Sequence, residues 1–251
     1  DVNRLKYLLR PLIALIFPVI LVVTQPDLGT AFLIGAGGAI VIWLSGVKMK
    51  FFAYLSAIFL FIAPVAISFL KPYQKSRILT FIDPSRDPLG AGYQITQSKI
   101  AIGSGGLFGK GFLNGSQSYL DYLPEKHTDF IFTLFSEEFG FFGSCLILAL
   151  YIIITWRIVT IGNATRDAFA KLFCYSFATS FFVYFVVNMC MVLGLIPIVG
   201  APLPILSYGG SSMMAMMFGL GIVMSCKIHK AVSYTHLRAH ETREDRGWRL
   251  G

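Results

Sequence analysis

The sequence predicts an all-α, polytopic membrane protein, and three observations lead to this fold class. Of the 251 residues, 55% are hydrophobic and only 14% are charged, whereas about a quarter of an average soluble domain is charged. The mean hydropathy is +0.69. Several apolar runs approach the roughly 20 residues that a helix needs to cross a bilayer. The length of these runs argues against a soluble protein with an unusually apolar core.

Six apolar segments are expected to form the membrane helices. They are residues 8–24, 28–44, 51–70, 130–156, 168–195 and 207–226. Gln25-Pro26-Asp27 separates the first two, because proline cannot continue a helix. Pro197, Pro202 and Pro204 favour an irregular connection between the last two. Residues 71–128, which are polar and rich in glycine, are expected to form one large loop between the third and fourth segments.

The charges of the short connections orient the chain. Basic residues lie between the second and third segments and between the fourth and fifth: Lys48, Lys50, Arg157, Arg166 and Lys171. Because cytoplasmic loops carry an excess of Lys and Arg, these connections are expected in the cytoplasm. Asp27, the 71–128 loop and the 196–206 connection then face the extracytoplasmic side. The net charge is +8, but it does not indicate nucleic-acid binding. The basic residues lie between the apolar runs and are not clustered on one soluble face.

The outward loop carries more cations than acids. Residues 71–128 include seven Lys and Arg side chains against four Asp and Glu. Such an excess outside the cytoplasm needs a local reason, and an anionic ligand is the obvious candidate. Within this loop, "IAIGSGGLFGKGF" (100–112) fails as a phosphate-binding P-loop, because Ser104 and Gly111 occupy positions that need Gly and Ser or Thr. It is either a flexible loop or a source of N–H donors beside Lys99 and Lys110.

The most informative stretch is "YLPEKHTDFIFTLFSEEFGFFG", residues 122–143, where acids enter an apolar run. An ionisable side chain in a membrane segment is a functional candidate by default. On a helix that starts near Thr128, Asp129 would share one stripe with Thr133, Ser136 and Glu137. Helix capping by Thr128 or Asp129 is the structural alternative. Capping would explain one acid but not Glu137 and Glu138, which lie two turns deeper.

Other polar residues point to sites less strongly. In "TQPDLGTAF" (24–32), Asp27 fits a turn that caps the following helix, which is the interpretation we prefer from this motif alone. Asn188 is a polar group inside an apolar segment, and the Gly, Pro and Ser residues of 188–212 could pack closely or line a cavity. The four cysteines lie in or beside apolar segments without the spacing of a metal site.

The two ends of the chain are interpreted separately. It begins with Asp1 and no signal peptide precedes its first apolar run, so we expect it to be the C-terminal portion of a longer protein. Residues 1–232 are expected to belong to a membrane domain. Residues 233–251, "SYTHLRAHETREDRGWRLG", have no membrane character and are interpreted as a non-native or disordered tail.

Four motifs together resemble one known family. "QPDLGT", "DPLGAGYQITQSKIAIGSGGLFGKG", "LPEKHTDFIF…EEFG" and "GLIPIVGAPLPILSYGGSS" occur in this order and are similar to the SEDS proteins (shape, elongation, division and sporulation). The resemblance covers nearly all of residues 1–232 and is closer to the elongation members than to the division members. The family has ten membrane helices, so it implies that the six segments here correspond to helices five to ten and that this fragment is inactive alone.

The resemblance implies a peptidoglycan glycosyltransferase of the bacterial inner membrane that polymerises lipid II on the extracytoplasmic side. It places the essential acid at Asp129, where a carboxylate can act as general base. His127, Thr128, Glu137, Glu138 and Asp27 are interpreted as supporting residues. The leaving pyrophosphate needs its charge stabilised by cations or a divalent metal such as Mg or Mn, a role given to Arg77, Lys99, Lys110 and Lys126. A class B penicillin-binding protein is the expected partner.

Two other functions remain open. A lipid II flippase would place charged groups near the bilayer midplane, whereas most of them lie here at the outer face and in the outer loop. A non-catalytic scaffold for the penicillin-binding protein would not need Asp129. Activity measurements on Asp129 therefore separate these functions.

Overall fold

The computed structural model describes residues 5–25, 27–68, 72–88, 90–119, 123 and 125–244, and these residues form helices and irregular connections without a strand. The elements are α1 (Leu5–Thr24), α2 (Leu28–Leu44), α3 (Met49–Ser68), α4 (Pro72–Ile82), the 3-10 turn η1 (Pro84–Arg86), α5 (Ala91–Ser104), α6 (Ser116–Tyr119), α7 (Ile131–Ala164), α8 (Ala168–Val192) and α9 (Gly210–Glu244). The predicted all-α class is confirmed for this part of the chain.

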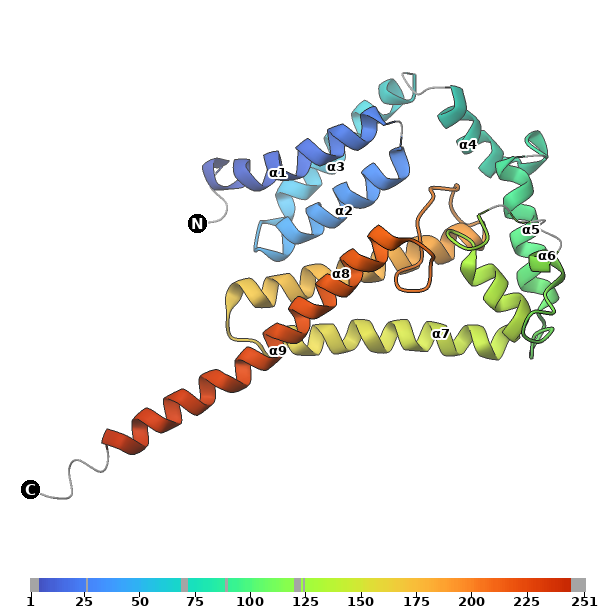
Figure 1. Ribbon diagram of the computed structural model, residues 1–251. Helices are drawn as coiled ribbons and strands as arrows, with labels where there is room; N and C mark the ends of the chain where they lie inside the picture. The colour runs from blue at the N-terminus through green and yellow to red at the C-terminus, as the bar shows by residue number, and fades with distance from the viewer. Residues whose placement is uncertain are drawn as a thin grey trace, which may run out of the picture.

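Long apolar helices run side by side, and the short helices gather at one end of them (Figure 1). Among the described residues, α7, α8 and the 210–228 part of α9 are long and apolar enough to cross a membrane. Three shorter apolar helices span Leu8–Thr24, Leu28–Leu44 and Met49–Ile58. The chain is therefore a multi-pass membrane protein. The exact number of six spans stays a prediction.

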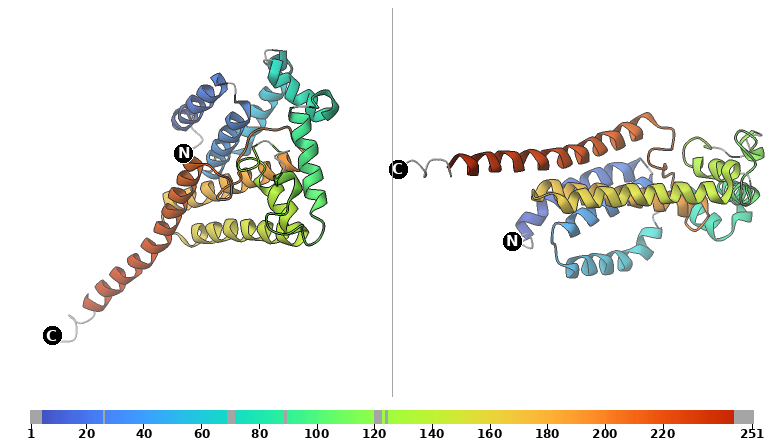
Figure 2. Two further views of the ribbon diagram at one scale, coloured as in Figure 1. Left: turned by 45° about the vertical axis from the view of Figure 1, so that its right-hand side comes forward. Right: turned by 90° about the horizontal axis from the view of Figure 1, so that it is seen from below.

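The short helices α4, α5 and α6 lie at the end of the molecule where α7 begins, whereas the C-terminal part of α9 leaves at the opposite end (Figure 2). The expected 71–128 loop is thus largely helical rather than irregular. The third membrane helix begins at 49 rather than 51, and its predicted end at residue 70 lies outside the described residues. The fourth and fifth helices end at 164 and 192 rather than 156 and 195. The sixth begins at Gly210 rather than at 207, and its helix continues to Glu244. Residues 233–244, which belong to the segment interpreted as a non-native or disordered tail, are part of this helix.

The fourth membrane helix differs most from its prediction. It begins at Ile131 rather than near Thr128. At Gly140 the backbone has φ 66° and ψ −159°, a conformation that only glycine adopts without strain. This glycine bends α7 sharply beside α5 and α6 (Figure 1). The helix consists of a short outer half, residues 131–139, and a long half after the bend.

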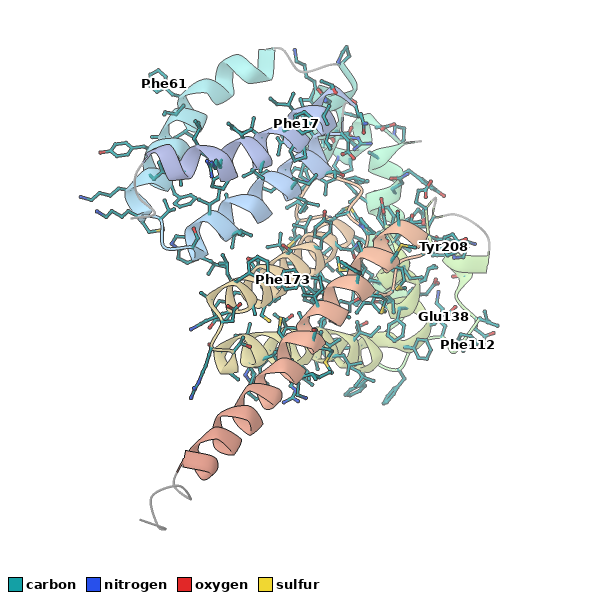
Figure 3. The ribbon with its side chains drawn as sticks, turned by 60° about the vertical axis from the view of Figure 1, so that its left-hand side comes forward. Phe17, Phe61, Phe112, Glu138, Phe173 and Tyr208 are labelled. Atoms are coloured by element: carbon teal, nitrogen blue, oxygen red, sulfur yellow. The ribbon has the colours of Figure 1, made fainter. Side chains whose placement is uncertain are left out.

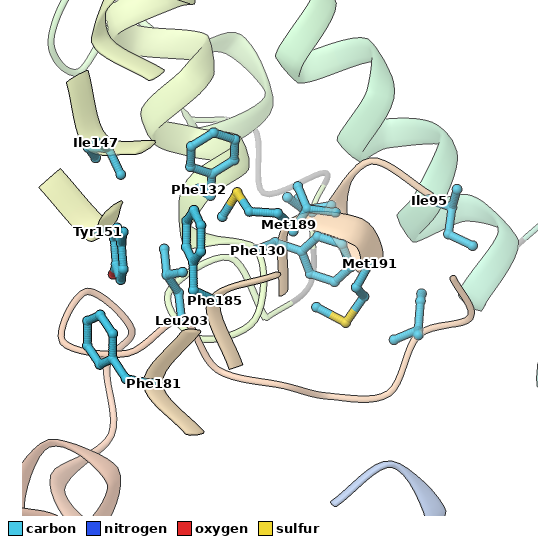
Figure 4. Packing of buried hydrophobic residues seen from close by; sticks show 13 residues of the cluster. Ile95, Phe130, Phe132, Ile147, Tyr151, Phe181, Phe185, Met189, Met191 and Leu203 are labelled. Carbon is cyan, nitrogen blue, oxygen red and sulfur yellow. The ribbon is translucent and has the colours of Figure 1, made fainter. Parts of the chain in front are cut away.

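The core joins α7, α8 and the connection to α9. Phe130, Tyr151, Phe181 and Phe185 are buried in one cluster, shown in Figure 4. Tyr151 stacks on Phe185 with ring centroids 4.6 Å apart, and its hydroxyl donates to the carbonyl of Pro204. Since irregular backbone inside a membrane must be buried in protein or line a cavity, this packing explains how the proline-rich 196–206 connection is tolerated.

Candidate functional site

A tight turn, residues 125–130, precedes α7 and carries Asp129. The backbone N–H groups of Thr128 and Phe130 donate to the carbonyl of Glu125 at 3.2 and 3.3 Å. The Thr128 hydroxyl also reaches the Glu125 carboxylate, at 3.0 Å. The N-cap residue of α7 is Phe130, whose side chain forms no capping hydrogen bond. Asp129 is therefore neither on the helix nor its cap, which corrects both structural expectations for it.

Two buried polar side chains hold the backbone of this turn. Asn188, which is 0% exposed, donates to the carbonyls of Asp129 at 2.8 Å and Ala201 at 2.7 Å. Ser207, which is 4% exposed, donates to the carbonyl of Thr128 at 2.6 Å. Buried polar groups of this kind fix a single geometry because breaking them leaves carbonyls unsatisfied. The turn is thus fastened to α8 and to the connection that follows it.

The Asp129 carboxylate interacts electrostatically with one side chain of its own turn and with side chains from two other segments. Burial raises its pKa above the ordinary value, Glu125 raises it further, Arg77 lowers it, and Asp27 raises it again. Within the described residues this carboxylate accepts no hydrogen bond. It is thus a half-buried acid in a mainly acidic environment, with one cation nearby.

Glycine contacts explain how these segments approach one another. A Cβ atom at Gly200 would lie 3.5 Å from the Asp129 carboxylate, and one at Gly29 would lie 2.4 Å from the carbonyl of Val199. Only glycine at position 29 lets α2 pack so closely on the 196–206 connection. Arg77, from α4, donates to the carbonyl of Ile198 at 3.1 Å in the same connection. The sequence therefore brings α2, α4 and the connection together around Asp129.

The remaining predicted residues of this region have distinct places. Asp27 caps α2, accepting from the N–H of Thr30 at 3.1 Å, as the motif predicted. His127 lines an open cavity of about 550 Å³ together with Ile131, Met213 and residues 206–210. Tyr208 of this cavity wall is visible in Figure 3. Asp129 is not among the residues that line this cavity. Lys126 is half-buried.

Lys99 lies against the end of α8. A Cβ atom at Gly194 would lie 2.5 Å from the Cε atom of Lys99, so the missing side chain at position 194 makes room for the lysine. Lys99 forms no ion pair with any residue that the structure describes. Its neighbour Ser98 is buried and shares a hydrogen bond of 2.9 Å with Thr133. Lys99 therefore keeps an uncommitted charge at this end of the molecule.

Glu137 and Lys110 form an ion pair away from Asp129. The Nζ atom of Lys110 lies 2.7 Å from an Oε1 atom of Glu137 that is fully buried. Ser116 Oγ at 3.1 Å and the Gln117 N–H at 3.2 Å donate to the same oxygen. Thr133, Ser136 and Glu137, which were expected to share one stripe of the helix, are all buried. Glu138 is half-buried, and its side chain forms no hydrogen bond within the described part of the chain.

Glu125 was the one acid at the site that sequence reasoning did not single out. It has a positive φ of 54°, which is uncommon for a residue with a side chain and often marks a functional loop. Its position two residues before His127 was visible, but its proximity to Asp129 depends on the turn. Ser207 was likewise not predicted as a site residue, because the sequence does not distinguish it from the other small residues of "LSYGGSS".

The residues that the structure describes contain no group of three or more His, Cys, Asp or Glu side chains arranged to hold a metal ion. Asp129 and Asp27 nevertheless lie near enough for their charges to interact. Mg²⁺ is usually bound through one or two carboxylates together with substrate phosphates. The available acids fit that mode and not a site made of protein ligands alone.

A model of the FtsW/RodA/SpoVE family, described as "Cell cycle protein", matches residues 2–232. The chain is 45% identical over 220 residues to the peptidoglycan glycosyltransferase MrdB of Escherichia coli strain K12, covering 87% of this chain and 60% of MrdB. The chain thus spans about three-fifths of that relative.

Two solved structures resemble the fold. A chain of a peptidoglycan synthase complex that coordinates polymerization and crosslinking has a TM-score of 0.75 and 32% identity, covering 92% of this chain and 63% of that one. The rod shape-determining protein RodA of Thermus thermophilus has a TM-score of 0.58 and 26% identity, covering 89% of this chain and 56% of that one.

Proposed function

The chain belongs to the FtsW/RodA/SpoVE (SEDS) family, and on this premise we propose that it is part of a peptidoglycan glycosyltransferase that polymerises lipid II during cell elongation. The relatives named as peptidoglycan glycosyltransferases support the reaction class. The observation that carries the proposal is the state of Asp129. Its backbone is fastened by Asn188 and its carboxylate is neither a helix cap nor hydrogen-bonded within the described residues. Such an acid is available to substrate.

In the proposed reaction, a sugar hydroxyl of one lipid II attacks the anomeric carbon of the growing chain. Asp129 accepts the hydroxyl proton as the new C–O bond forms, and the bond to the lipid pyrophosphate breaks with its electron pair. Displacement at an α-linked donor inverts the centre and gives a β-linked glycan. The environment that raises the pKa of Asp129 makes its carboxylate a stronger base, closer to the pKa that suits a general base at neutral pH.

The departing pyrophosphate carries charge that cations must stabilise. We assign this role to Arg77, Lys99 and Lys126, and the charge of Arg77 also lowers the pKa of Asp129. A divalent cation would add Lewis-acid stabilisation and would be held by Asp27 with the pyrophosphate oxygens, which leaves Asp129 to accept the proton. Thr128 and Glu125 keep the turn closed, because the Thr128 hydroxyl donates to the Glu125 carboxylate.

The proposal includes an orientation and a partner. With the six predicted membrane helices, we propose that Asp27, the 71–128 segment and Asp129 face the extracytoplasmic side of the inner membrane, where lipid II presents its sugars. A class B penicillin-binding protein is the proposed partner, since the similar peptidoglycan synthase complex couples polymerization to crosslinking. Labelling of single cysteines introduced at Lys48 and Lys99 tests the orientation. Access to position 99 only after the cytoplasm is opened would reverse it.

The decisive experiment measures glycan formation from purified lipid II by the protein at its relatives' full length, with Asp129 or with Asn in its place. Asn is nearly the same size but cannot accept the proton, so we expect a loss of about 10²-fold or more. A melting curve and co-purification with the partner control for folding. Polymerisation by the Asn variant at the parent rate would remove the catalytic assignment and favour the scaffold function.

A further inference from the structure

We infer that Lys110 and Glu137 form a positioning pair, whose ion pair locks the loop 105–111 into the bend of α7 and thereby sets the direction of the outer half-helix that follows Asp129. The inference rests on the proposed function, because it assigns a role in the same reaction. It also gives Lys110 a task other than the pyrophosphate binding expected from the sequence.

The backbone at the bend shows how the loop completes α7. In an unbroken helix, the N–H groups of Phe141 and Phe142 would donate to the carbonyls of Glu137 and Glu138. Here those two N–H groups donate to the carbonyls of Gly106 and Leu107 at 2.9 and 3.2 Å. The two orphaned carbonyls accept instead from the N–H groups of Lys110 and Gly111, both at 3.0 Å. The loop therefore replaces both helical bonds that the bend removes.

Three glycines allow this close approach. A Cβ atom at Gly105 would lie 2.2 Å from the carbonyl of Ser136, one at Gly109 would lie 2.0 Å from the carbonyl of Glu138, and one at Gly140 would lie 2.3 Å from the nitrogen of Gly109. Each of these distances is too short for a real side chain. The glycine-rich motif is thus explained by contact with α7 rather than by an anionic ligand.

The ion pair fixes the same loop through side chains. The Glu137 carboxylate is 0% exposed, and burying a charge is costly unless it is paired. Lys110 is its only ion-pair partner among the described residues, at 2.7 Å. The ammonium also donates to Ser116 at 2.8 Å. Lys110 cannot turn toward a substrate without abandoning a buried carboxylate, so its charge is committed to Glu137.

The pair can influence Asp129 through the rigid outer half-helix. Six residues separate Glu137 from Ile131, the first residue of the half-helix, which is about 9 Å at 1.5 Å per residue. A tilt of about 6° at the Glu137 end would therefore move the start of the helix, and the adjoining turn that carries Asp129, by roughly 1 Å, and a displacement of that size can cost about 10²-fold in rate. The other end of the half-helix adjoins the turn that Asn188 and Ser207 hold. Loss of the pair would remove the side-chain contact that holds the Glu137 end.

A double-mutant cycle in the protein at its relatives' full length tests the inference, with Lys110→Met, Glu137→Gln and both changes together. Removing one partner strands a buried charge or donor, whereas neutralising both is often tolerated. We expect each single variant to lose about 10- to 100-fold in kcat with a nearly unchanged KM for lipid II, and to melt at a lower temperature. The double variant should be closer to the parent in both kcat and melting temperature than either single variant.

Glu138→Gln is the matched control, because it neutralises the adjacent acid, which forms no side-chain hydrogen bond in the described part of the chain. Its effect should be several times smaller than that of Glu137→Gln. A double variant no better than the worse single variant would overturn the inference. So would a raised KM in Lys110→Met that persists in the double variant, since that is the behaviour of a substrate ligand. Full activity of Asp129→Asn in the same assays would instead overturn the catalytic assignment. The melting temperatures of the single and double variants would then still show whether Lys110 and Glu137 stabilise the protein as a pair.

Discussion

Replacing Gly140 by alanine should disrupt the joint between α7 and the loop 105–111. The residue has φ 66° and ψ −159°, a region where a side chain costs about 1–3 kcal/mol. The new Cβ atom would lie 2.3 Å from the nitrogen of Gly109, so the loop must withdraw. If two of the four backbone hydrogen bonds at the bend break, they add about 1 kcal/mol each. The expected loss is about 3–5 kcal/mol of unfolding free energy.

The assay is denaturant unfolding of the purified protein in mild detergent, with polymerisation of lipid II measured on the same samples. Gly103→Ala is the control, because a Cβ atom at this α5 position would meet no heavy atom within 4 Å. Alanine there should stabilise the helix by up to about 1 kcal/mol. Equal unfolding free energies for the two variants would refute the reasoning, because the bend would then tolerate a side chain.

Three further predictions concern the site. The rate of polymerisation should fall as the pH drops through the raised pKa of Asp129, at a higher pH than for an ordinary aspartate; a pH–rate profile without this limb would contradict it. Because the pKa of Asp129 is higher in the folded than in the unfolded protein, ionisation of this residue reduces the free energy of unfolding. The reduction begins as the pH rises above the unfolded-state pKa and is complete above the folded-state pKa. Asp129→Asn should therefore melt no lower than the parent at neutral pH and lose this advantage in acid. Asn188→Ala strands the carbonyls of Asp129 and Ala201 and should cost about 2–5 kcal/mol, measured by unfolding; a smaller cost than for an exposed polar-to-Ala change would refute it. For Lys99, Arg should preserve lipid II use better than Gln, and equal KM values for both variants would remove it from the pyrophosphate site.

Local sequence was sufficient for the helical class and for some helix boundaries. Apolar runs of membrane length, broken by prolines, predicted α2 at 28–44 and the first residue of α8 correctly. The Asp27 cap followed from a motif of a few residues. These features depend on interactions between residues that are close in the chain, which is why a single sequence can reveal them. The role of Asp129 came from the order of four motifs.

The tertiary structure decided how the acids are used. The sequence suggested one continuous helix, so Asp129 and Glu137 were expected to serve one site. Asp129 instead lies in the turn before Ile131, whereas Glu137 lies near the far end of the half-helix, just before the bend at Gly140. Glu137 pairs with Lys110, 27 residues earlier, whereas Asp129 meets the charges of Asp27 and Arg77 from distant helices. Such pairings arise from how helices pack and where glycine permits close contact. The sequence therefore identifies the charged residues, but which of them interact is determined only by the tertiary structure.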